Sequence, residues 1–227
     1  MTTYLYDTFD GSGAVDGRTP NEGSGSWSAP STTFSVSGGL MAQTAVNANA
    51  ANFSIGSPTS PLYVEAEVNM PTRSPSNINE CAVFEINPES GGAFQYLFRL
   101  AAFDGVVKWM TFFAEYTSGE YGDYIGDWVA TAIPAGSTVT AKIEATATDA
   151  KFFIDGVELY SWAPPSGVTF FGTAVKLSIR PVAANVVAAA WGVDSIRIAN
   201  SPASVPAPPP FWMDHISTIE TIKTETP

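Results

Sequence analysis

Hydrophobic and polar residues alternate along several stretches of this chain. The clearest stretch spans residues 62–69, and its apolar members are Leu62, Val64, Ala66 and Val68. Residues 138–145 and 175–180 show the same alternation. Because successive side chains of a strand point to opposite faces, each stretch predicts a strand with one buried side and one solvent-facing side. This pattern is typical of half-buried antiparallel strands.

Asp-Gly pairs separate apolar runs at two places. Asp104-Gly105 follows the run 98–103, and Asp155-Gly156 lies between the runs 152–154 and 157–162. Asp-Gly favours the tight turn in which both central residues have positive φ, which matches the twist of a β-hairpin. Helical periodicity is hard to find before residue 200, and the alanine-rich stretch 183–191, the best candidate, suits a strand as well. About a dozen strands without strand–helix alternation predict an all-β sandwich of two packed antiparallel sheets.

The composition divides the chain into three parts. Residues 10–39 are rich in Gly, Ser, Thr and Asn and predict long loops between short strands. After Asn200 a run of prolines predicts a stiff, extended connector. We therefore expect a globular domain at 1–200, a proline-rich connector at 201–210 and a C-terminal arm at 211–227. The length of 227 residues suits one large sandwich with a tail.

The charge and the cysteine content limit which partners and which cellular compartment are expected. Ten Lys+Arg against 22 Asp+Glu give a net charge of −12, which disfavours nucleic acid as a partner. The single cysteine, Cys81, excludes an intrachain disulfide, so folding in a reducing cytoplasm is expected. The N-terminus lacks the pattern of a signal peptide, and no run reaches the roughly 18 apolar residues of a membrane span. Neither secretion by signal peptide nor membrane insertion is expected.

Three stretches carry a resemblance to a known fold family. They are the opening segment 7–13 with its loop to Trp27, the strand 64–68, and the closing segments 139–145, 152–157 and 193–198. Together they resemble the concanavalin-like, laminin-G-type jelly rolls of bacteriophage virion proteins, over most of residues 3–199. The resemblance implies a two-sheet jelly-roll sandwich and a virion structural role. Such folds host lectins, hydrolases and inert modules alike.

Catalytic chemistry finds little support in the sequence. The only histidine, His215, lies beyond the connector, which excludes a Ser-His-Asp or Cys-His site in the domain. One Cys and one His cannot supply a zinc site. Glu65 and Glu67 have the spacing of paired carboxylates on one strand face, as glycoside hydrolysis requires, but Asn69 stands where a third carboxylate is expected. The sequence therefore predicts a protein that is not an enzyme, with glycoside hydrolysis as an alternative.

Aromatic and acidic residues are mixed in one stretch between residues 115 and 128. Such a mixture can stack a sugar and accept hydrogen bonds from its hydroxyls. The alternative is that these aromatic side chains belong to the core or cover the surface of a hairpin. The candidate carbohydrate-binding residues are Tyr116, Tyr121, Tyr124, Trp128, Asp123 and Asp127.

Aspartates near the first and last strands suggest a calcium site, because Ca²⁺ prefers hard oxygen ligands. The candidate ligands are Asp7, Asp10, Asp16 and, if the first and last strands pair, Asp194. Turn formation is the alternative role for these aspartates. No other cofactor is expected.

The arm carries apolar residues that a soluble monomer rarely leaves in water. The candidate anchoring residues are Phe211, Trp212, Met213, Ile216, Ile219 and Ile222. Together with the resemblance, they favour a virion protein, made in the host cytoplasm, that decorates the capsid through its arm. The expected partners are other virion proteins, copies of itself and a host-surface glycan. A carbohydrate- or receptor-binding module of a tail fibre or appendage is the alternative.

Overall fold

The computed structural model contains only β-strands in the part of the chain that it describes. Those residues are 2–29, 34–43, 51–56, 58–72, 74–76, 82–88, 94–117, 120–121, 127–146, 148–163, 174–181 and 192–202. No helix occurs among them, and therefore none that could cross a membrane. The predicted all-β class is confirmed. The described residues form eighteen strands, more than the dozen expected, because the loop-rich region 10–39 contributes four strands of only two to four residues.

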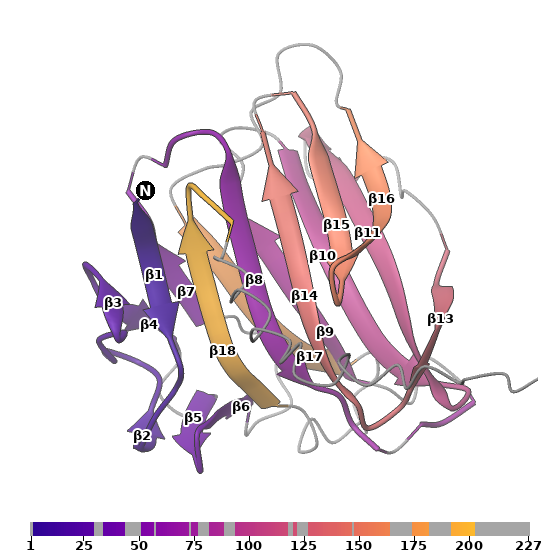
Figure 1. Cartoon of the computed structure of the whole chain (residues 1–227), viewed down its shortest axis with the longest axis horizontal. Helices are drawn as coiled ribbons and strands as arrows, with labels where there is room; N and C mark the ends of the chain where they lie inside the picture. The colour runs from indigo at the N-terminus through magenta and orange to yellow at the C-terminus, as the bar shows by residue number, and fades with distance from the viewer. Residues whose placement is uncertain are drawn as a thin grey trace, which may run out of the picture.

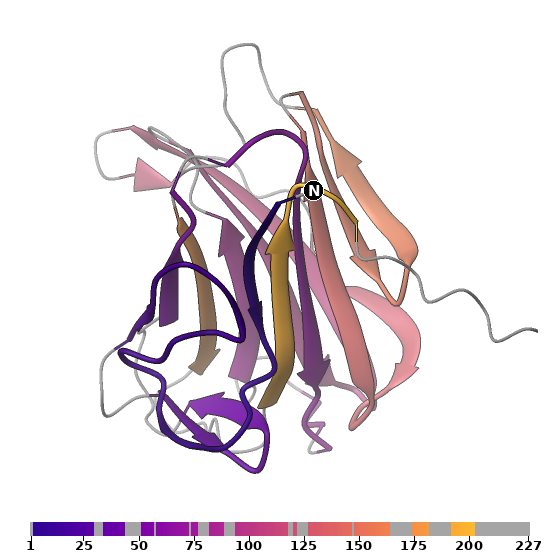
Figure 2. The same cartoon turned by 60° about the vertical axis from the view of Figure 1, so that its left-hand side comes forward.

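The strands form two antiparallel sheets that pack face to face (Figures 1 and 2). The first, named here the β8 sheet, has the order β16-β15-β14-β8-β18-β6-β5-β2, and β1 pairs with both β18 and β3. Its strands are β1 (Thr3–Asp7), β2 (Ser12–Ala14), β3 (Glu22–Gly23), β5 (Phe34–Ser37), β6 (Leu40–Gln43), β8 (Leu62–Asn69), β14 (Thr138–Ala145), β15 (Ala150–Ile154), β16 (Val157–Trp162) and β18 (Gly192–Ala199).

The second sheet, named here the β10 sheet, has the order β12-β11-β10-β9-β17-β7-β4, and β13 pairs with β11. Its strands are β4 (Trp27–Ser28), β7 (Ala51–Ser54), β9 (Ala82–Pro88), β10 (Phe94–Phe103), β11 (Val106–Thr117), β12 (Glu120–Tyr121), β13 (Val129–Pro134) and β17 (Ala174–Pro181). Every pairing between strands is antiparallel among the described residues.

The hydrophobic core lies between the two sheets. In β8 and β14 the apolar side of each alternating run is fully buried, as the sequence predicted. Phe98 of the β10 sheet and Phe152 of the β8 sheet meet across the core, with ring centroids 5.5 Å apart. Large aromatic side chains bury much apolar area each, so such contacts between sheets stabilise the sandwich.

Both Asp-Gly pairs form the predicted hairpins. Asp104 and Gly105 join β10 to β11 with φ of 54° and 82°. Asp155 and Gly156 join β15 to β16 with φ of 50° and 78°. Positive φ at both central residues is the conformation that this dipeptide favours.

The first and last strands of the sandwich lie side by side. β1 pairs with β18, and Asn200 extends the contact because its backbone N–H donates to the carbonyl of Thr2. The Asn200 side-chain oxygen in turn accepts a hydrogen bond from the Thr2 N–H at 2.7 Å. The condition under which Asp194 could join the other aspartates, the pairing of the first and last strands, is therefore met.

Candidate functional site

Only part of the predicted carbohydrate-binding stretch falls within the described residues. Tyr116 and Tyr121 are directly paired in backbone register between β11 and β12. Asp127 is exposed and Trp128 is half-buried. Tyr124 and Asp123 lie outside the described residues, and the predicted cluster as a whole is therefore neither confirmed nor contradicted.

Trp128 packs on the outer side of the β10 sheet. Phe98, Leu100 and Ala102 of β10 point into the main core, so the residues that alternate with them face away from the sandwich interior. We name this surface the β10 outer face; it comprises Leu97, Arg99, Ala101 and Phe103 of β10 with Val83 and Glu85 of β9. Val83, Ala101 and Phe103 form a second small hydrophobic cluster there, and Trp128 packs against it.

Phe103 orients the Trp128 indole. The two rings meet edge to face, with centroids 5.7 Å apart and an interplanar angle of 88°. The Lys108 ammonium lies 3.9 Å from the Phe103 ring centroid and forms an ion pair of 2.6 Å with Asp104. These contacts hold a half-buried tryptophan on a rigid base, with charged groups and the exposed Asp127 around it.

A charged pair also lies on the β10 outer face. Glu85 is only 5% exposed, and its Oε2 accepts a hydrogen bond of 2.8 Å from Nε of Arg99, its cross-strand neighbour. Among the described residues, Asp7 and Glu85 are the buried charged side chains. Buried charges are retained in proteins when they are paired, and they are common at binding and catalytic sites.

Our reading of the sequence missed Glu85 and Arg99. The available signal was a single charge within each of two apolar runs, Val83-Phe84-Glu85-Ile86 and Leu97-Phe98-Arg99-Leu100. Opposite charges in two such strands suggest a partnership, but only the observed register pairs them.

The carboxylates of β8 occupy a different surface. Glu65 and Glu67 alternate with buried residues and so lie on the outer side of the β8 sheet, as expected. In register, Glu65 stands between Lys142 of β14 and Arg197 of β18. A carboxylate between two cationic positions across a sheet is typical of stabilising cross-strand pairing.

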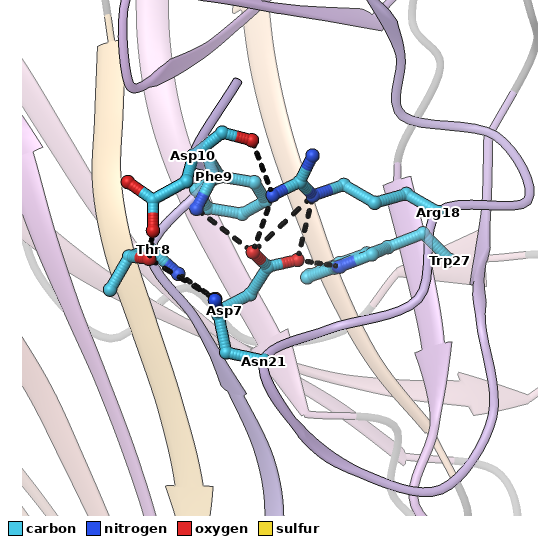
Figure 3. A network of polar contacts seen from close by, with 7 residues as sticks. All are labelled: Asp7, Thr8, Phe9, Asp10, Arg18, Asn21 and Trp27. Atoms are coloured by element: carbon cyan, nitrogen blue, oxygen red, sulfur yellow. Dashed lines mark hydrogen bonds and ion pairs between the residues drawn. The ribbon is translucent and has the colours of Figure 1, made fainter. Parts of the chain in front are cut away.

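Asp7 is at the centre of a polar network at the end of β1 (Figure 3). Its carboxylate is fully buried and accepts hydrogen bonds from Nε and Nη2 of Arg18, from Nε1 of Trp27 and from the Phe9 backbone N–H. Nη2 of Arg18 also donates to the Asp10 carbonyl at 3.0 Å. The network therefore holds the segment between β1 and β4, which includes β2 and β3, against the sandwich, and this role is structural.

The four aspartates proposed as calcium ligands are not assembled into a metal site. The Asp7 carboxylate is occupied by Arg18, Asp10 accepts a hydrogen bond from the Thr8 hydroxyl, and Asp16 accepts one from the Ala29 N–H. Asp194 lies on β18, and within the described part of the chain no three acidic, His or Cys side chains form a metal-binding group. The alternative role in turns fits Asp7, whose carboxylate accepts the N–H of Phe9, two residues further along the chain.

Architecture and connectivity identify the domain as a concanavalin-like jelly-roll β-sandwich. The Bacillus licheniformis β-glucanase superimposes with a TM-score of 0.55 at 12% identity, over 87% of this chain and 98% of that enzyme. LamAcat of Zobellia galactanivorans gives 0.55 at 14% identity, over 87% and 97%. The CBM2 module of the evolved Dit protein of Lactobacillus casei BL23 phage J-1 gives 0.54 at 13% identity, over 86% and 94%. No protein-family model and no curated protein sequence matches the chain.

These neighbours correct the prediction that the protein is not an enzyme. A β-glucanase shares the fold over nearly its whole length, so the fold gives no ground for excluding catalysis. The lack of a histidine within the domain does not exclude it either, because glycoside hydrolysis needs carboxyl groups rather than histidine. The prediction of an inert domain relied on the missing histidine and on Asn69 in place of a third carboxylate beside Glu65 and Glu67, and it overlooked the buried Glu85 on the other sheet.

The predicted anchoring residues, from Phe211 to Ile222, lie outside the described residues, as do Cys81 and the alanine-rich stretch 183–191. The role of the arm stays a prediction.

Proposed function

We propose that this jelly roll binds carbohydrate through the β10 outer face, with Trp128 as the residue that stacks on a sugar ring. The observation that carries the proposal is the half-buried indole held edge to face on Phe103. An indole in this position offers an apolar face to the C–H groups of a sugar, and its orientation costs little entropy on binding because Phe103 already restricts it.

The surroundings of Trp128 suit a polyhydroxylated ligand. The Asp104–Lys108 ion pair and the exposed Asp127 place charged acceptors and donors beside the indole. Charged groups form the stronger hydrogen bonds with hydroxyls, and sugar sites combine such groups with an aromatic platform. The fold likeness to a phage carbohydrate-binding module supports the same class of ligand.

A comparison of two tryptophan variants tests this proposal. We expect Trp128→Ala to weaken binding to an array of bacterial surface polysaccharides by tenfold or more. Trp162→Ala is the matched control, because Trp162 is also half-buried but lies on β16 of the other sheet. Unchanged glycan binding by a folded Trp128→Ala protein, judged by its melting temperature, would overturn the proposal.

Glycan cleavage on the same face is a second candidate function, favoured by the buried Glu85 carboxylate. Hydrolysis uses two carboxyl groups, and Glu85 would supply one of them. Release of reducing ends from a bound polysaccharide by the wild type, and its loss in Glu85→Gln with binding retained, would establish cleavage. Binding without turnover would reject it.

We further propose that the domain belongs to a phage particle as a receptor-binding module of a tail appendage. The fold of the phage Dit module supports this assignment, and a proline-rich connector followed by an apolar arm suits attachment to a larger assembly. Immunogold labelling of intact particles tests it. Gold at the tail tip supports the proposal, whereas gold over the head would assign the protein to capsid decoration instead.

A further inference from the structure

A pocket opens at the start of β1, away from the β10 outer face. It has a volume of about 370 Å³ and is lined by residues 2–4, 24–25 and 54–56. Figure 1 places β1, β3, β4 and β7 together at one side of the sandwich, and β11 and β13 at the other. The pocket is therefore distinct from the β10 outer face around Trp128. Its volume falls in the lower part of the range for small-molecule sites, which is roughly 300–1,000 Å³.

Two fixed points hold the segment that carries Ser24 and Gly25, which line the pocket. Gly23 pairs with Leu5, and an added Cβ at Gly23 would lie 2.2 Å from the Tyr4 carbonyl oxygen, so only glycine allows this close approach. Trp27 is held by its hydrogen bond to Asp7. Because both ends of the segment are anchored, Ser24 and Gly25 between them are kept in place at the rim.

Tyr4, another residue of the lining, is also fixed. The Tyr4 hydroxyl accepts a hydrogen bond of 2.8 Å from the Thr59 backbone N–H, which holds the phenol ring against the core. Gly56 has φ of 67°, and a Cβ there would meet no heavy atom within 4 Å. The pocket is thus preformed, and glycine leaves backbone accessible at its edge.

The chemistry of the lining is neutral and rich in hydroxyl groups. Among the residues that the structure describes, no acidic or basic side chain lines the pocket, although the chain carries a net charge of −12. Within the part of the chain that the structure describes, the side-chain hydroxyls of Thr3 and Ser24 make no hydrogen bond, so they are available to a ligand. Tyr4 and Ile55 add apolar surface beside these hydroxyls.

We infer that this pocket is a binding site for one neutral mono- or disaccharide unit. Hydroxyls that both donate and accept match sugar hydroxyls, and an aromatic side chain beside them matches the apolar face of a pyranose. The described part of the lining offers no cationic side chain, and this disfavours uronic and sialic acids, because their carboxylate would lose hydration without gaining a cationic partner there.

Amide-detected NMR titration of the full chain tests this site. The probes are glucose, galactose, N-acetylglucosamine, lactose and cellobiose, with glucuronic acid as the charged comparison. At least one neutral sugar is expected to shift the amides of residues 2–4, 24–25 and 54–56, and glucuronic acid to shift them less. If none of the neutral sugars shifts these amides, or if only glucuronic acid does, the inference is overturned.

Variants separate this pocket from the β10 outer face. Ser24→Trp should fill the pocket and abolish binding, whereas Ser28→Trp, an exposed serine outside the lining, should leave binding unchanged. Thr3→Val removes one hydroxyl from a strand that tolerates valine and should weaken binding by about 2–10-fold, the effect of one hydrogen bond. Trp128→Ala should have no effect on these amide shifts. Equal binding by Ser24→Trp and the wild type would reject the site, whatever the result for Trp128.

Discussion

Nε1 of Trp27 donates a hydrogen bond of 2.8 Å to the carboxylate of Asp7, twenty residues earlier in the chain. The same carboxylate forms an ion pair with Arg18 and is fully buried. One side chain thus connects the first strand of the β8 sheet to β4 of the β10 sheet, through the loop that lies between them (Figure 3).

We expect Asp7→Ala to lower the free energy of unfolding by about 3–5 kcal/mol, because it leaves the Arg18 guanidinium and the Trp27 N–H without their buried acceptor. Urea denaturation measures the change. Asp10→Ala is the control: its carboxylate is exposed and accepts only the Thr8 hydroxyl, so a loss of about 1 kcal/mol or less is expected. Equal losses in the two variants would contradict the central role of Asp7.

The variants Gly23→Ala and Gly11→Ala together test the close approach of β3 to β1. Both have positive φ, 108° and 90°, so alanine is strained at either position. Only at Gly23 does the new Cβ collide with backbone. Gly23→Ala should therefore cost about 1–3 kcal/mol more than Gly11→Ala in the same denaturation experiment. Similar losses of unfolding free energy in the two variants would show that the backbone around Gly23 shifts to accommodate the new Cβ.

A double-mutant cycle measures the Glu85–Arg99 pair. Each single variant, Glu85→Gln and Arg99→Met, should destabilise the domain by about 3 kcal/mol, because it breaks the ion pair of a carboxylate that is only 5% exposed. The double variant should lose less than the sum of the two, since the contact between the two side chains is lost only once. Strict additivity would mean that the 2.8 Å contact contributes no coupling.

Tyr63 reports on the outer side of the β8 sheet. Burial raises the pKa of its phenol above 10.0, and the negative charge of Glu144 and the hydrogen bond to that carboxylate raise it further. The pKa of Tyr63 is higher in the folded state than in the unfolded state, so folding favours the neutral phenol. The contribution of this preference to the free energy of unfolding is complete below pH of about 10, and it is lost as the pH rises through the pKa of Tyr63 in the folded state.

Spectrophotometric titration at 295 nm of the wild type and Tyr63→Phe isolates this group. Glu144→Gln should lower the pKa of Tyr63 but leave it above the usual value, because burial is the largest cause. An unchanged pKa in Glu144→Gln would remove Glu144 as a cause.

Truncation tests the C-terminal boundary. A chain that ends at Pro202 keeps the contacts of Asn200 with Thr2 and Thr59 and the Arg197 bond to the Ser201 carbonyl. We expect it to melt at the temperature of the full chain. A chain that ends at Ala199 loses these contacts and should melt several degrees lower. A lower melting temperature for the Pro202 chain would show that the arm stabilises the sandwich.

The hairpins and the alternating strands follow from the sequence. Asp104-Gly105 and Asp155-Gly156 specify their turns because the φ preference of each residue is local. Residues 62–69 and 138–145 specify their buried sides because the two-residue period of a strand is local as well. The short strands of region 10–39 were not predicted individually, since their apolar residues are too few to set a period.

The candidate sites follow from tertiary structure. Glu65 and Glu67 were considered as paired carboxylates because their spacing is visible within one strand. Glu85 and Arg99 belong to two strands, and no local pattern encodes the register between them. Trp128 was predicted as a site residue from its neighbours in sequence, yet its geometry depends on Phe103, a residue of β10.

The sequence by itself determined the all-β class, the two hairpin turns and the buried sides of β8 and β14, because backbone preference and side-chain alternation act over a few residues. Only the tertiary structure decided that Asp7 binds Trp27 and Arg18 rather than a metal ion, that Glu85 is buried beside Arg99, and that Tyr4, Ser24 and Gly56 enclose one pocket. Each of these groupings joins residues from separate strands or loops, and their proximity depends on strand order and register, which are set by the packing of the whole sandwich.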